Sequence, residues 1–594
     1  MSTTASSFVC SPVASASSGC LLPPSKHGAA PTMAKLQGRR LSCRAAATAG
    51  SGGDDSVVRR NIDRRDVLFG LTGFAAVTTT NLGLALAADA DAGAAAEPLC
   101  ATVPITAEVL KCNAEGGFHC PAEYDATKVV DFSSLPLPSG PPRVRRPAHK
   151  LDDEYIKKFE EAVRRMKELD DEDPRSFKNQ SGIHEAYCDA HYRVVSAASP
   201  EVNFDVHYSS IFAPWHRMYI YFFERILGDL IGDPTFGLPY WNWDSPEGMI
   251  MPSIFANESS PLYDELRTPE HVRAFMDLNL GPAKQPNLPE PECTDDILCL
   301  IDNNLYSMYR QMTVDTPEEF HGGKFCTAGK KYTGSLENGA HTAAHIWVGK
   351  DMGNLRTAAR DPVFYSNHSN VDRMWHLRST KLGMPDLPYQ EWLDTSFVFY
   401  DETKRPVRIR VQDVLDTSKL GYRFEEKKKL EWMQKRPKPS SEIKRPFIAQ
   451  RSVTPASAFP VPLKKGQNEY VTVERPEKAQ AGGGSSKKAP EVLVLDLTVD
   501  PCEYVKFDVL VNVPRGQEDK VGPKNSEFAG SFTHVPHGGG DGGRMMETQE
   551  VSYRLKLREI IEDLKCGRDK RLDFTIVPVA GEKTLVNSVR IDIL

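Results

Sequence analysis

Two hydrophobic periods divide the chain. Across residues 151–169, apolar side chains recur every three or four positions among charged ones, which predicts an amphipathic surface helix. Across residues 492–499, 504–511, 572–577 and 589–594 the period changes to two, which predicts β-strands. We therefore expect a mainly α domain, built as a helical bundle, followed by a C-terminal β-sandwich.

Proline and glycine mark the ends of further helices. Pro214 is tolerated in the first turn of a helix and not in its interior, so the aromatic-rich residues 214–230 predict a buried helix that begins there. Gly349 ends a predicted helix over residues 336–348. Asp361 and Pro362 are suited to cap and to open another helix.

The first ninety residues have the composition of targeting signals. Residues 1–50 are rich in Ser and Ala, carry basic residues and contain no acidic one, which is typical of an organellar transit peptide. In residues 51–90, Arg64 and Arg65 precede an apolar run and a stretch of small residues, which indicates a twin-arginine signal. A single membrane anchor is the alternative, but the run is short and includes the polar residues 78–81. We expect the thylakoid lumen of a plastid, and no stable membrane span in the mature protein.

The remaining chain divides at a polar connection. Residues 91–425 are expected to form the catalytic domain, and residues 491–594 the sandwich. Between them, residues 426–490 contain a Lys-rich run and a Gly/Ser-rich run, which predicts an exposed linker open to an activating protease.

Composition narrows the class of protein. A chain of 594 residues is too long for one core, and a net charge of −7 without a basic face argues against nucleic acid as a partner. Twelve cysteines are too few for a disulfide scaffold of this length. Cys112 and Cys120 lie close together in a Pro-rich segment, where a disulfide fits an oxidising lumen. Nothing in the sequence indicates an oligomeric state.

Two groups of histidines carry the candidate chemistry. His184, His207 and His216 lie within about forty residues, with Cys188 four positions after the first. A second group lies downstream at His341, His345 and His368; its first two members are four residues apart and can reach one ion from a helix. Asp372 follows His368 by four residues and is placed to orient an imidazole or an arginine.

Neutral imidazoles without a carboxylate favour copper or zinc over magnesium or calcium. Two all-histidine groups favour copper, because a hydrolytic dizinc centre usually includes a bridging Asp or Glu. Any one of these histidines alone would be read as a buried hydrogen-bonding residue. Six of them in two groups favour the metal interpretation.

These motifs resemble the plant polyphenol oxidases, or catechol oxidases, which are type-3 copper proteins together with tyrosinases and haemocyanins. The resemblance covers almost the whole chain. It rests on both signals, both histidine groups, the Glu-Trp-Leu-Asp run that begins at Glu391 and the Lys-Phe-Asp-Val run that begins at Lys506.

The resemblance implies two copper ions per chain, with dioxygen as co-substrate and small phenols as substrates. One ion would be held by the first histidine group and the other by the second. It further implies a thioether bond between Cys188 and His207, for which a small buried thiol is the alternative, and a water-orienting role for Glu337.

Several positions depart from the family pattern. Asn367 stands where many members have a histidine before the last ligand, and Leu355 replaces a bulky phenylalanine gate. Thr342 replaces an asparagine that helps to hold water beside Glu337. A second disulfide of the family is absent, and a His119–Glu185 ion pair is a candidate substitute.

We expect a latent catechol oxidase that converts o-diphenols to o-quinones and reduces dioxygen to water, with weak monophenol hydroxylation. The β-sandwich would cover the copper site until it is cut or loosened. The alternatives are a tyrosinase-like monophenol hydroxylase or a phenol oxidase of specialised metabolism. A haemocyanin-like oxygen carrier and a non-catalytic relative are less favoured.

Overall fold

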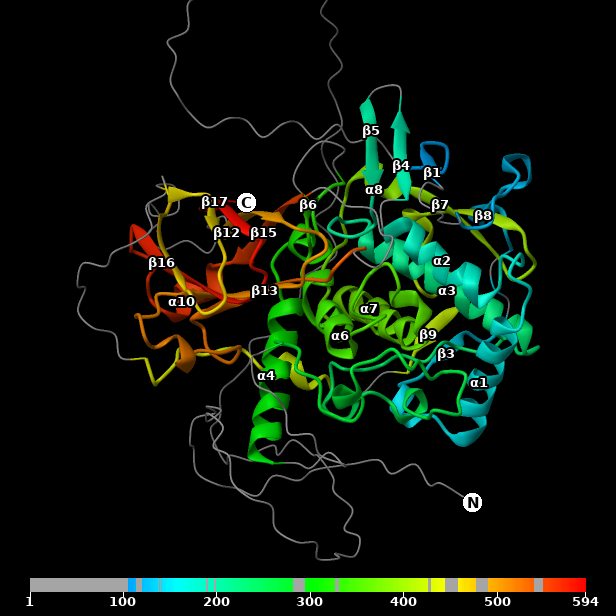
Figure 1. The fold of residues 1–594 in the computed structure, drawn as a ribbon, viewed down its shortest axis with the longest axis horizontal. Coiled ribbons are helices and arrows are strands. Elements are labelled where there is room, and N and C mark those ends of the chain that lie inside the picture. The colour runs from blue at the N-terminus through cyan, green and yellow to red at the C-terminus, as the bar shows by residue number, and fades with distance from the viewer. Residues whose placement is uncertain are drawn as a thin grey trace, which may run out of the picture.

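The structure is a computed structural model in which a helical domain and a β-sandwich lie side by side (Figure 1). It describes residues 105–113, 120–136, 138, 140–188, 191–196, 199–280, 294–325, 331–425, 429–443, 458–476, 490–538 and 548–593. Both predicted targeting signals lie outside these residues. The predicted fold class is confirmed.

Helices make up most of the domain that precedes the sandwich, called the helical half below. The long ones are α1 (Asp153–Lys167), α2 (Phe177–Cys188), α3 (Phe212–Leu230), α4 (Asp295–Met312) and α7 (Val363–Thr380), and the short ones are α5 (Pro317–His321), α6 (Thr342–Val348) and α8 (Gln390–Asp394). Helix α1 confirms the amphipathic pattern, because Asp152 caps it at Tyr155 N (2.9 Å) and the apolar face, Phe159 included, is buried. Among the helices of the described segments, none is both long and apolar enough to span a membrane.

Short strands fasten the edges of the helical domain. β1 (Leu110–Cys112), β4 (Tyr192–Ser196) and β5 (Ser199–Phe204) form one sheet, and β2 (Val130–Asp131), β7 (Ser396–Tyr400) and β8 (Pro406–Arg410) form another. β3 (Arg143–Arg145) pairs in parallel with β9 (Tyr422–Phe424). Cys112 and Cys120 form a disulfide, as the sequence predicted.

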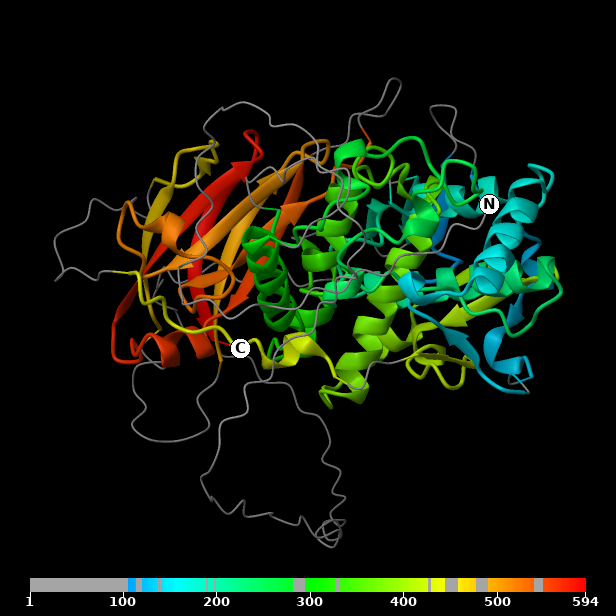
Figure 2. The same ribbon diagram turned by 90° about the horizontal axis from the view of Figure 1, so that it is seen from below.

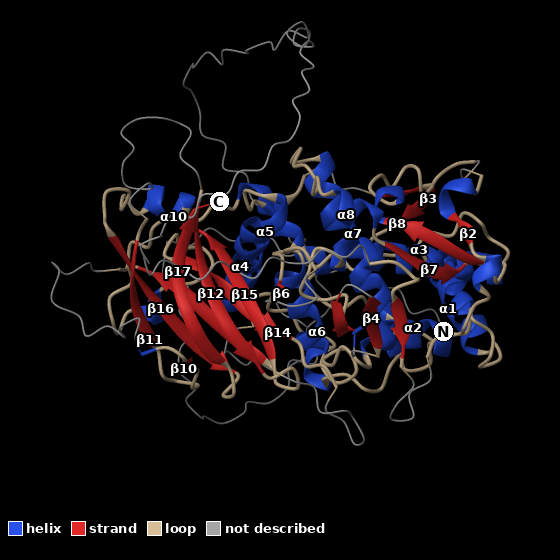
Figure 3. Ribbon diagram, turned by 90° about the horizontal axis from the view of Figure 1, so that it is seen from above, coloured by secondary structure: helices blue, strands red, loops and turns tan. Residues whose placement is uncertain are grey.

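The C-terminal half contains two packed sheets, drawn in red in Figure 3. One has the order β10 (Val461–Pro462), β17 (Leu585–Ile593), β12 (Glu491–Val499), β15 (Gln549–Lys556) and β6 (Lys331–Tyr332); the other has β11 (Glu469–Glu474), β16 (Arg571–Ala580), β13 (Val505–Val511) and β14 (Phe528–His534). A short helix, α10 (Arg558–Asp563), follows β15. Strands β10 and β11 fall within residues 426–490, so part of the predicted linker belongs to the sandwich; their charged and proline-containing sequences hid the strand pattern.

The two halves exchange structural elements. By its position in the sequence β6 belongs to the helical half, yet it pairs in parallel with β15, with Lys331 opposite Val551. Helix α4 runs beside the sandwich (Figure 2), and Arg310 on it donates to Pro523 O (3.1 Å) and Asn525 O (2.6 Å). Tyr208 packs into the core of the sandwich, and Val535 packs into the core of the helical half. These contacts join the halves through their interiors.

One predicted helix is interrupted. α6 ends at Gly349, whose φ is +72°, as predicted. Residues 337–341 instead form an irregular turn, since Asn338 and Gly339 have non-helical backbone angles. A side chain at Gly339 would meet Gln311 Oε1 at 2.4 Å, so the turn requires glycine to pack against α4.

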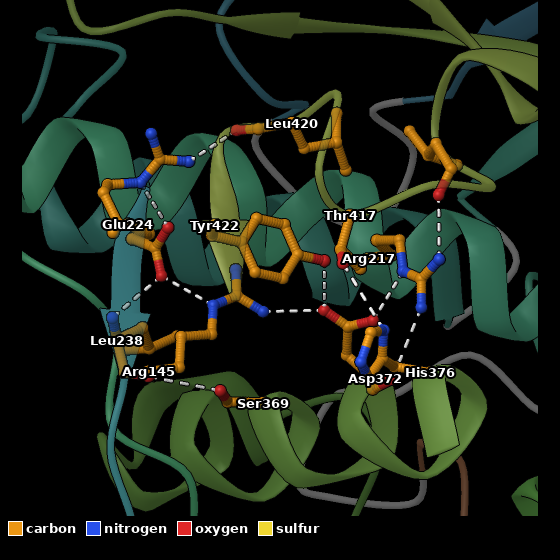
Figure 4. Close-up of polar contacts among 12 residues, drawn as sticks. Arg145, Arg217, Glu224, Leu238, Ser369, Asp372, His376, Thr417, Leu420 and Tyr422 are labelled. Carbon is orange, nitrogen blue, oxygen red and sulfur yellow. Dashed lines mark hydrogen bonds and ion pairs between the residues drawn. The ribbon is translucent and has the colours of Figure 1, made fainter. Parts of the chain in front are cut away.

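A buried ion network ties α3 to α7 and to the β3–β9 pair (Figure 4). The Asp372 carboxylate accepts from Arg217 Nε (2.5 Å), Arg145 Nη1 (2.6 Å) and the Tyr422 hydroxyl (2.6 Å). Glu224 binds Arg145 Nε (2.6 Å) and Arg143 Nε (2.7 Å). Nearby arginines lower the pKa of Asp372, although burial opposes that shift.

We expect Asp372→Asn to destabilise the protein strongly, because it leaves Arg217 buried beside a neutral partner and removes one of the two carboxylates that bind Arg145. Breaking such a buried pair costs about 3–5 kcal/mol. Denaturant unfolding measures the loss. The exposed pair Arg164–Glu168 supplies the control, since Glu168→Gln should leave the unfolding midpoint nearly unchanged. Equal midpoints for the two variants would contradict the anchoring role of the network.

Candidate dinuclear metal site

Six histidines converge from separate elements onto one buried centre. His184 lies on α2, His207 in the loop after β5 and His216 on α3. His341 ends the irregular turn, and His345 and His368 lie on α6 and α7. Each is at most 2% exposed. The two groups separated in sequence therefore form one site.

Ring separations define two triads. Within the first group the ring centroids of His184, His207 and His216 are 5.4–5.7 Å apart. Within the second they are 4.6–5.7 Å apart. The triads touch where the rings of His216 and His368 stack at 4.2 Å. This arrangement suits two ions held next to each other.

Each of the six Nε2 atoms is buried without a hydrogen-bond partner. Four of the rings direct Nδ1 at an acceptor: Asp205 Oδ1 (3.2 Å) for His207, Phe212 O (2.8 Å) for His216, Glu337 O (3.1 Å) for His341 and Met352 O (2.7 Å) for His345. An Nδ1 beside an acceptor carries the hydrogen, so the lone pair of Nε2 is left for a metal. An ordinary buried hydrogen-bonding role does not account for these rings.

Burial also keeps the rings neutral. Desolvation lowers the pKa of His184, His216, His341 and His368 well below the ordinary value, and it lowers the pKa of His345 to about 3. Neutral imidazole is the form that binds metal. The donor set therefore fits borderline or soft ions such as copper or zinc.

Asp205 is a member of the site that the sequence analysis missed. Its Oδ1 accepts from the backbone N–H of His207 (2.9 Å), and the same oxygen lies 3.2 Å from the ring Nδ1 of that residue. Its Oδ2 pairs with Lys331 Nζ (3.1 Å), a residue of the domain-joining strand β6. Two positions before a ligand histidine is a position from which an acidic residue can orient that ligand, and this spacing was a usable signal.

Cys188 is fully buried against the first triad. Its sulfur and ring nitrogens of His184 and His207 all lie within 4.8 Å of one another. Cys188 therefore neighbours the His207 ring, and the thioether bond between them stays a prediction.

Glu337 is placed close to the second triad but is held by the protein. Both its carboxylate oxygens accept from Tyr208 N (2.9 and 3.0 Å), and one also accepts from Thr333 Oγ1 (3.2 Å). Burial raises its pKa to about 8. Thr342 Oγ1 donates to the backbone carbonyl of Glu337 (2.7 Å), so its single hydrogen is already committed.

The other predicted site residues take different positions. Leu355 is buried, and its N–H donates to Pro536 O (2.9 Å) of the C-terminal half. Asn367 Oδ1 accepts from Trp243 Nε1 (2.9 Å). Asp372 orients arginines rather than imidazoles. Glu185 pairs with Arg356 and Arg360, each at 2.9 Å, while its suggested partner His119 lies outside the described residues.

Phenylalanines and C-terminal histidines complete the surroundings. The ring of Phe364 lies 4.6 Å from His184 and 4.2 Å from His368, and Phe212 lies 4.6 Å from His216. His537 lies 5.9 Å from His207 although it belongs to the sandwich. No local sequence pattern linked His537 to a ligand more than three hundred residues earlier.

Family comparisons agree with this architecture. Residues 174–381 match the common central domain of tyrosinase, residues 386–438 the polyphenol oxidase middle domain, and residues 459–593 the chloroplastic polyphenol oxidase C-terminal domain. The chain thus belongs to the plant polyphenol oxidases of the tyrosinase family, a family of dicopper oxidoreductases.

Named relatives cover most of the chain. Polyphenol oxidase II, chloroplastic, of Ipomoea batatas is 38% identical over 89% of both chains, and (+)-larreatricin hydroxylase, chloroplastic, of Larrea tridentata is 35% identical over 91% of this chain and 92% of its own. The structure of latent apple tyrosinase is 36% identical, with a TM-score of 0.69 over 78% of this chain and 99% of that one. Recombinantly expressed latent aurone synthase reaches a TM-score of 0.71 at 34% identity, over 83% of this chain and 99% of that one.

Metal analysis of purified protein tests the two triads. We expect the six-histidine centre to hold two copper ions per chain, and we expect His345→Ala to lose one of these two, because only the second triad loses a ligand. His271→Ala is the control, since His271 stacks on Trp347 outside both triads. One copper per wild-type chain, or zinc in stoichiometric amount, would overturn the assignment.

Proposed function

We propose that this protein oxidises o-diphenols to o-quinones and reduces dioxygen to water. The observation that carries the proposal is the convergence of six neutral histidines whose Nε2 atoms are buried and unpartnered. Two copper ions held there would supply the paired electron acceptance that the conversion of a diphenol to a quinone requires. One ion is assigned to His184, His207 and His216, and the other to His341, His345 and His368.

Contacts with protein oxygens position four of the six ligand rings. Carbonyl oxygens of Phe212, Glu337 and Met352 hold three of the rings, and the Asp205 carboxylate holds His207. Cys188 is assigned the thioether bond to His207, which would remove the remaining freedom of that ring. Preorganisation of this kind lets the ions change oxidation state without rearranging the protein.

Monophenol hydroxylation additionally needs a group that takes the phenol proton. Glu337 is the candidate, acting through water, and its raised pKa is that of a base suited to neutral pH. Two contacts weaken Glu337 as a base here. The Tyr208 N–H donates to both carboxylate oxygens, which opposes the rise in the pKa of Glu337. Thr342 gives its hydrogen to the backbone carbonyl of Glu337, so it has no hydrogen left to hold a water. These contacts favour diphenol oxidation over hydroxylation.

The second candidate function is a hydroxylase or a specialised phenol oxidase. It is favoured by relatives named (+)-larreatricin hydroxylase and aureusidin synthase, the latter 39% identical over 78% of this chain. Leu355 also offers a smaller side chain than a phenylalanine gate, which suits larger phenols. An oxygen carrier would bind dioxygen without turnover, and an assay of catechol oxidation separates it from the enzyme.

The C-terminal sandwich is proposed to keep the enzyme latent. Its loop at residues 535–538 lies against the gate position: Pro536 O accepts from Leu355 N (2.9 Å), and Gly538 O accepts from Asn354 Nδ2 (2.7 Å). Val535 is buried in the core of the helical half. The similarity to structures described as latent supports the same assignment.

The plastid is supported by relatives named chloroplastic, and the thylakoid lumen is our proposal from the twin-arginine pair. The domain boundaries at residues 50, 90 and 425 and an activating protease are likewise proposed. We assign residues 1–50 and 51–90 to removable signals.

Cleavage between residues 444 and 457, inside the proposed linker and ahead of β10 and β11, tests latency. We expect the cut protein to oxidise diphenols much faster once the sandwich separates, because Leu355 and Asn354 are released from the 535–538 loop. Oxygen uptake with dopamine before and after the cut measures the change, with a sample incubated without protease as the control. Equal rates would show that the sandwich is a structural companion only.

Thr342→Asn tests the basis of substrate preference. The amide can hold water beside Glu337, so tyramine hydroxylation should rise about ten- to a hundredfold, the effect of a hydrogen bond worth about 1–3 kcal/mol. Dopamine oxidation should change little. Thr342→Val, which removes the hydroxyl at constant size, is the matched control and should not raise the tyramine rate.

Leu355→Phe separates access from proton transfer, since it should slow only bulky phenols such as chlorogenate. A wild-type protein that hydroxylates tyramine as fast as it oxidises dopamine would contradict the role given to Thr342.

A further inference from the structure

The C-terminal half brings two histidines of its own to the edge of the first triad. His534 ends strand β14 and His537 follows three residues later, and both are fully buried. Their ring centroids are 5.3 Å apart, and the ring of His537 lies 5.9 Å from that of His207. A continuous row of imidazoles therefore leads from the sandwich into the proposed copper site.

One nitrogen of each ring in this pair has no partner in the protein. His534 Nδ1 lies 3.0 Å from Glu503 O and so carries the hydrogen, which leaves the lone pair on Nε2. That Nε2 is buried without a hydrogen-bond partner, and so is His537 Nδ1, whereas His537 Nε2 faces Asp205 Oδ2 at 3.4 Å. Two buried lone pairs without partners, next to each other, need an explanation.

The spacing of the pair is that of metal ligands in the same molecule. Ring pairs within the two triads are 4.6–5.7 Å apart, and the 5.3 Å between His534 and His537 falls inside this range. Ring nitrogens of His207 and His537 and a carboxylate oxygen of Asp205 also lie within 4.8 Å of one another. His537 thus lies beside the first triad, and His534 adds a second imidazole next to it.

The charges around His534 and His537 determine which kind of ion the pair favours. Asp205 Oδ2 lies 3.4 Å from His537 Nε2, but it already pairs with Lys331 at 3.1 Å, so little negative charge is left to attract a hard divalent cation. Hydrogen on His537 Nε2 would face Asp205 and leave Nδ1 as the second lone pair. Two imidazole ligands whose nearby carboxylate is already paired with a lysine suit a soft monovalent ion, and Cu(I) is the ion of that class that the proposed function uses.

We propose that His534 and His537 form an accessory Cu(I) site at the junction of the two halves, next to the two copper positions of the catalytic centre. Both ligands come from the sandwich, while the neighbouring His207 and Asp205 come from the helical half. Copper bound there is one imidazole away from the first triad and is positioned to be passed to it. The identity of the ion rests on the proposed copper function, whereas the ligand pair does not.

Anaerobic titration of the metal-free, full-length chain with Cu(I) tests the site. In competition with the chromophoric Cu(I) chelator bicinchoninate, we expect three equivalents to bind to the wild type. His534→Asn and His537→Ala should each bind two, and both should fill the catalytic centre more slowly after copper is added. His271→Ala, whose ring lies outside the row, should still bind three.

Electron paramagnetic resonance after oxidation gives an independent readout. A third, isolated Cu(II) contributes about one spin per chain, and this signal should be missing from both variants. Two equivalents in the wild type, with the catalytic pair filled, would overturn the accessory site and leave the proposed function standing. Three equivalents in both variants would overturn the ligand assignment. Fewer than two in the wild type would contradict the proposed function itself.

Discussion

The burial of six imidazole lone pairs without hydrogen-bond partners is the constraint on which the rest of the structure depends. Each such group carries a desolvation cost that no protein contact repays. The fold can keep these groups in place only if rigid elements hold every ring. Backbone carbonyls of Phe212, Glu337 and Met352 hold three of the rings, and the Asp205 carboxylate holds a fourth. The Asp372 and Glu224 networks fix α3 and α7, which carry the facing rings His216 and His368. The need to hold the metal ligands rigidly thus accounts for the buried ion networks of Asp372 and Glu224 next to the centre.

The sequence predicted the centre because helical spacing and the position of a proline are enough to group its ligands. Helical spacing paired His341 with His345, and Pro214 separated His207 from the helix of His216. The same reasoning missed Asp205, although its two-residue offset from His207 is a local signal. Helical spacing from His368 also placed Asp372 to orient an imidazole or an arginine, and Asp372 binds Arg217 and Arg145. The bond from Trp243 Nε1 to Asn367 Oδ1 joins segments that are distant in sequence, so helical spacing did not predict it.

Contacts between the two halves could not be predicted from local sequence patterns. Strand β6 has only two residues, so its pairing with β15 depends on a partner more than two hundred positions away. The helix expected over residues 336–348 fails at Asn338 and Gly339 for the same reason. Asn338 uses its amide to bind Ser531 O (3.0 Å) and Thr533 N (2.9 Å) of β14, and Gly339 lets the turn approach α4. Asn and Gly are also poor helix formers, so local propensity and tertiary contacts both favour the break.

That interrupted turn supplies a physical link between the sandwich and the chemistry. It carries Glu337 at one end and His341 at the other, while its middle is bonded to β14. The strand then continues into His534 and the 535–538 loop, which lies against Leu355. Displacement of the sandwich would therefore uncover the gate and, at the same time, release the backbone that positions one ligand and the candidate base. The same interface covers the gate at Leu355 and positions the turn that carries Glu337 and His341. Latency is therefore coupled to the geometry of the second triad as well as to the access of substrate.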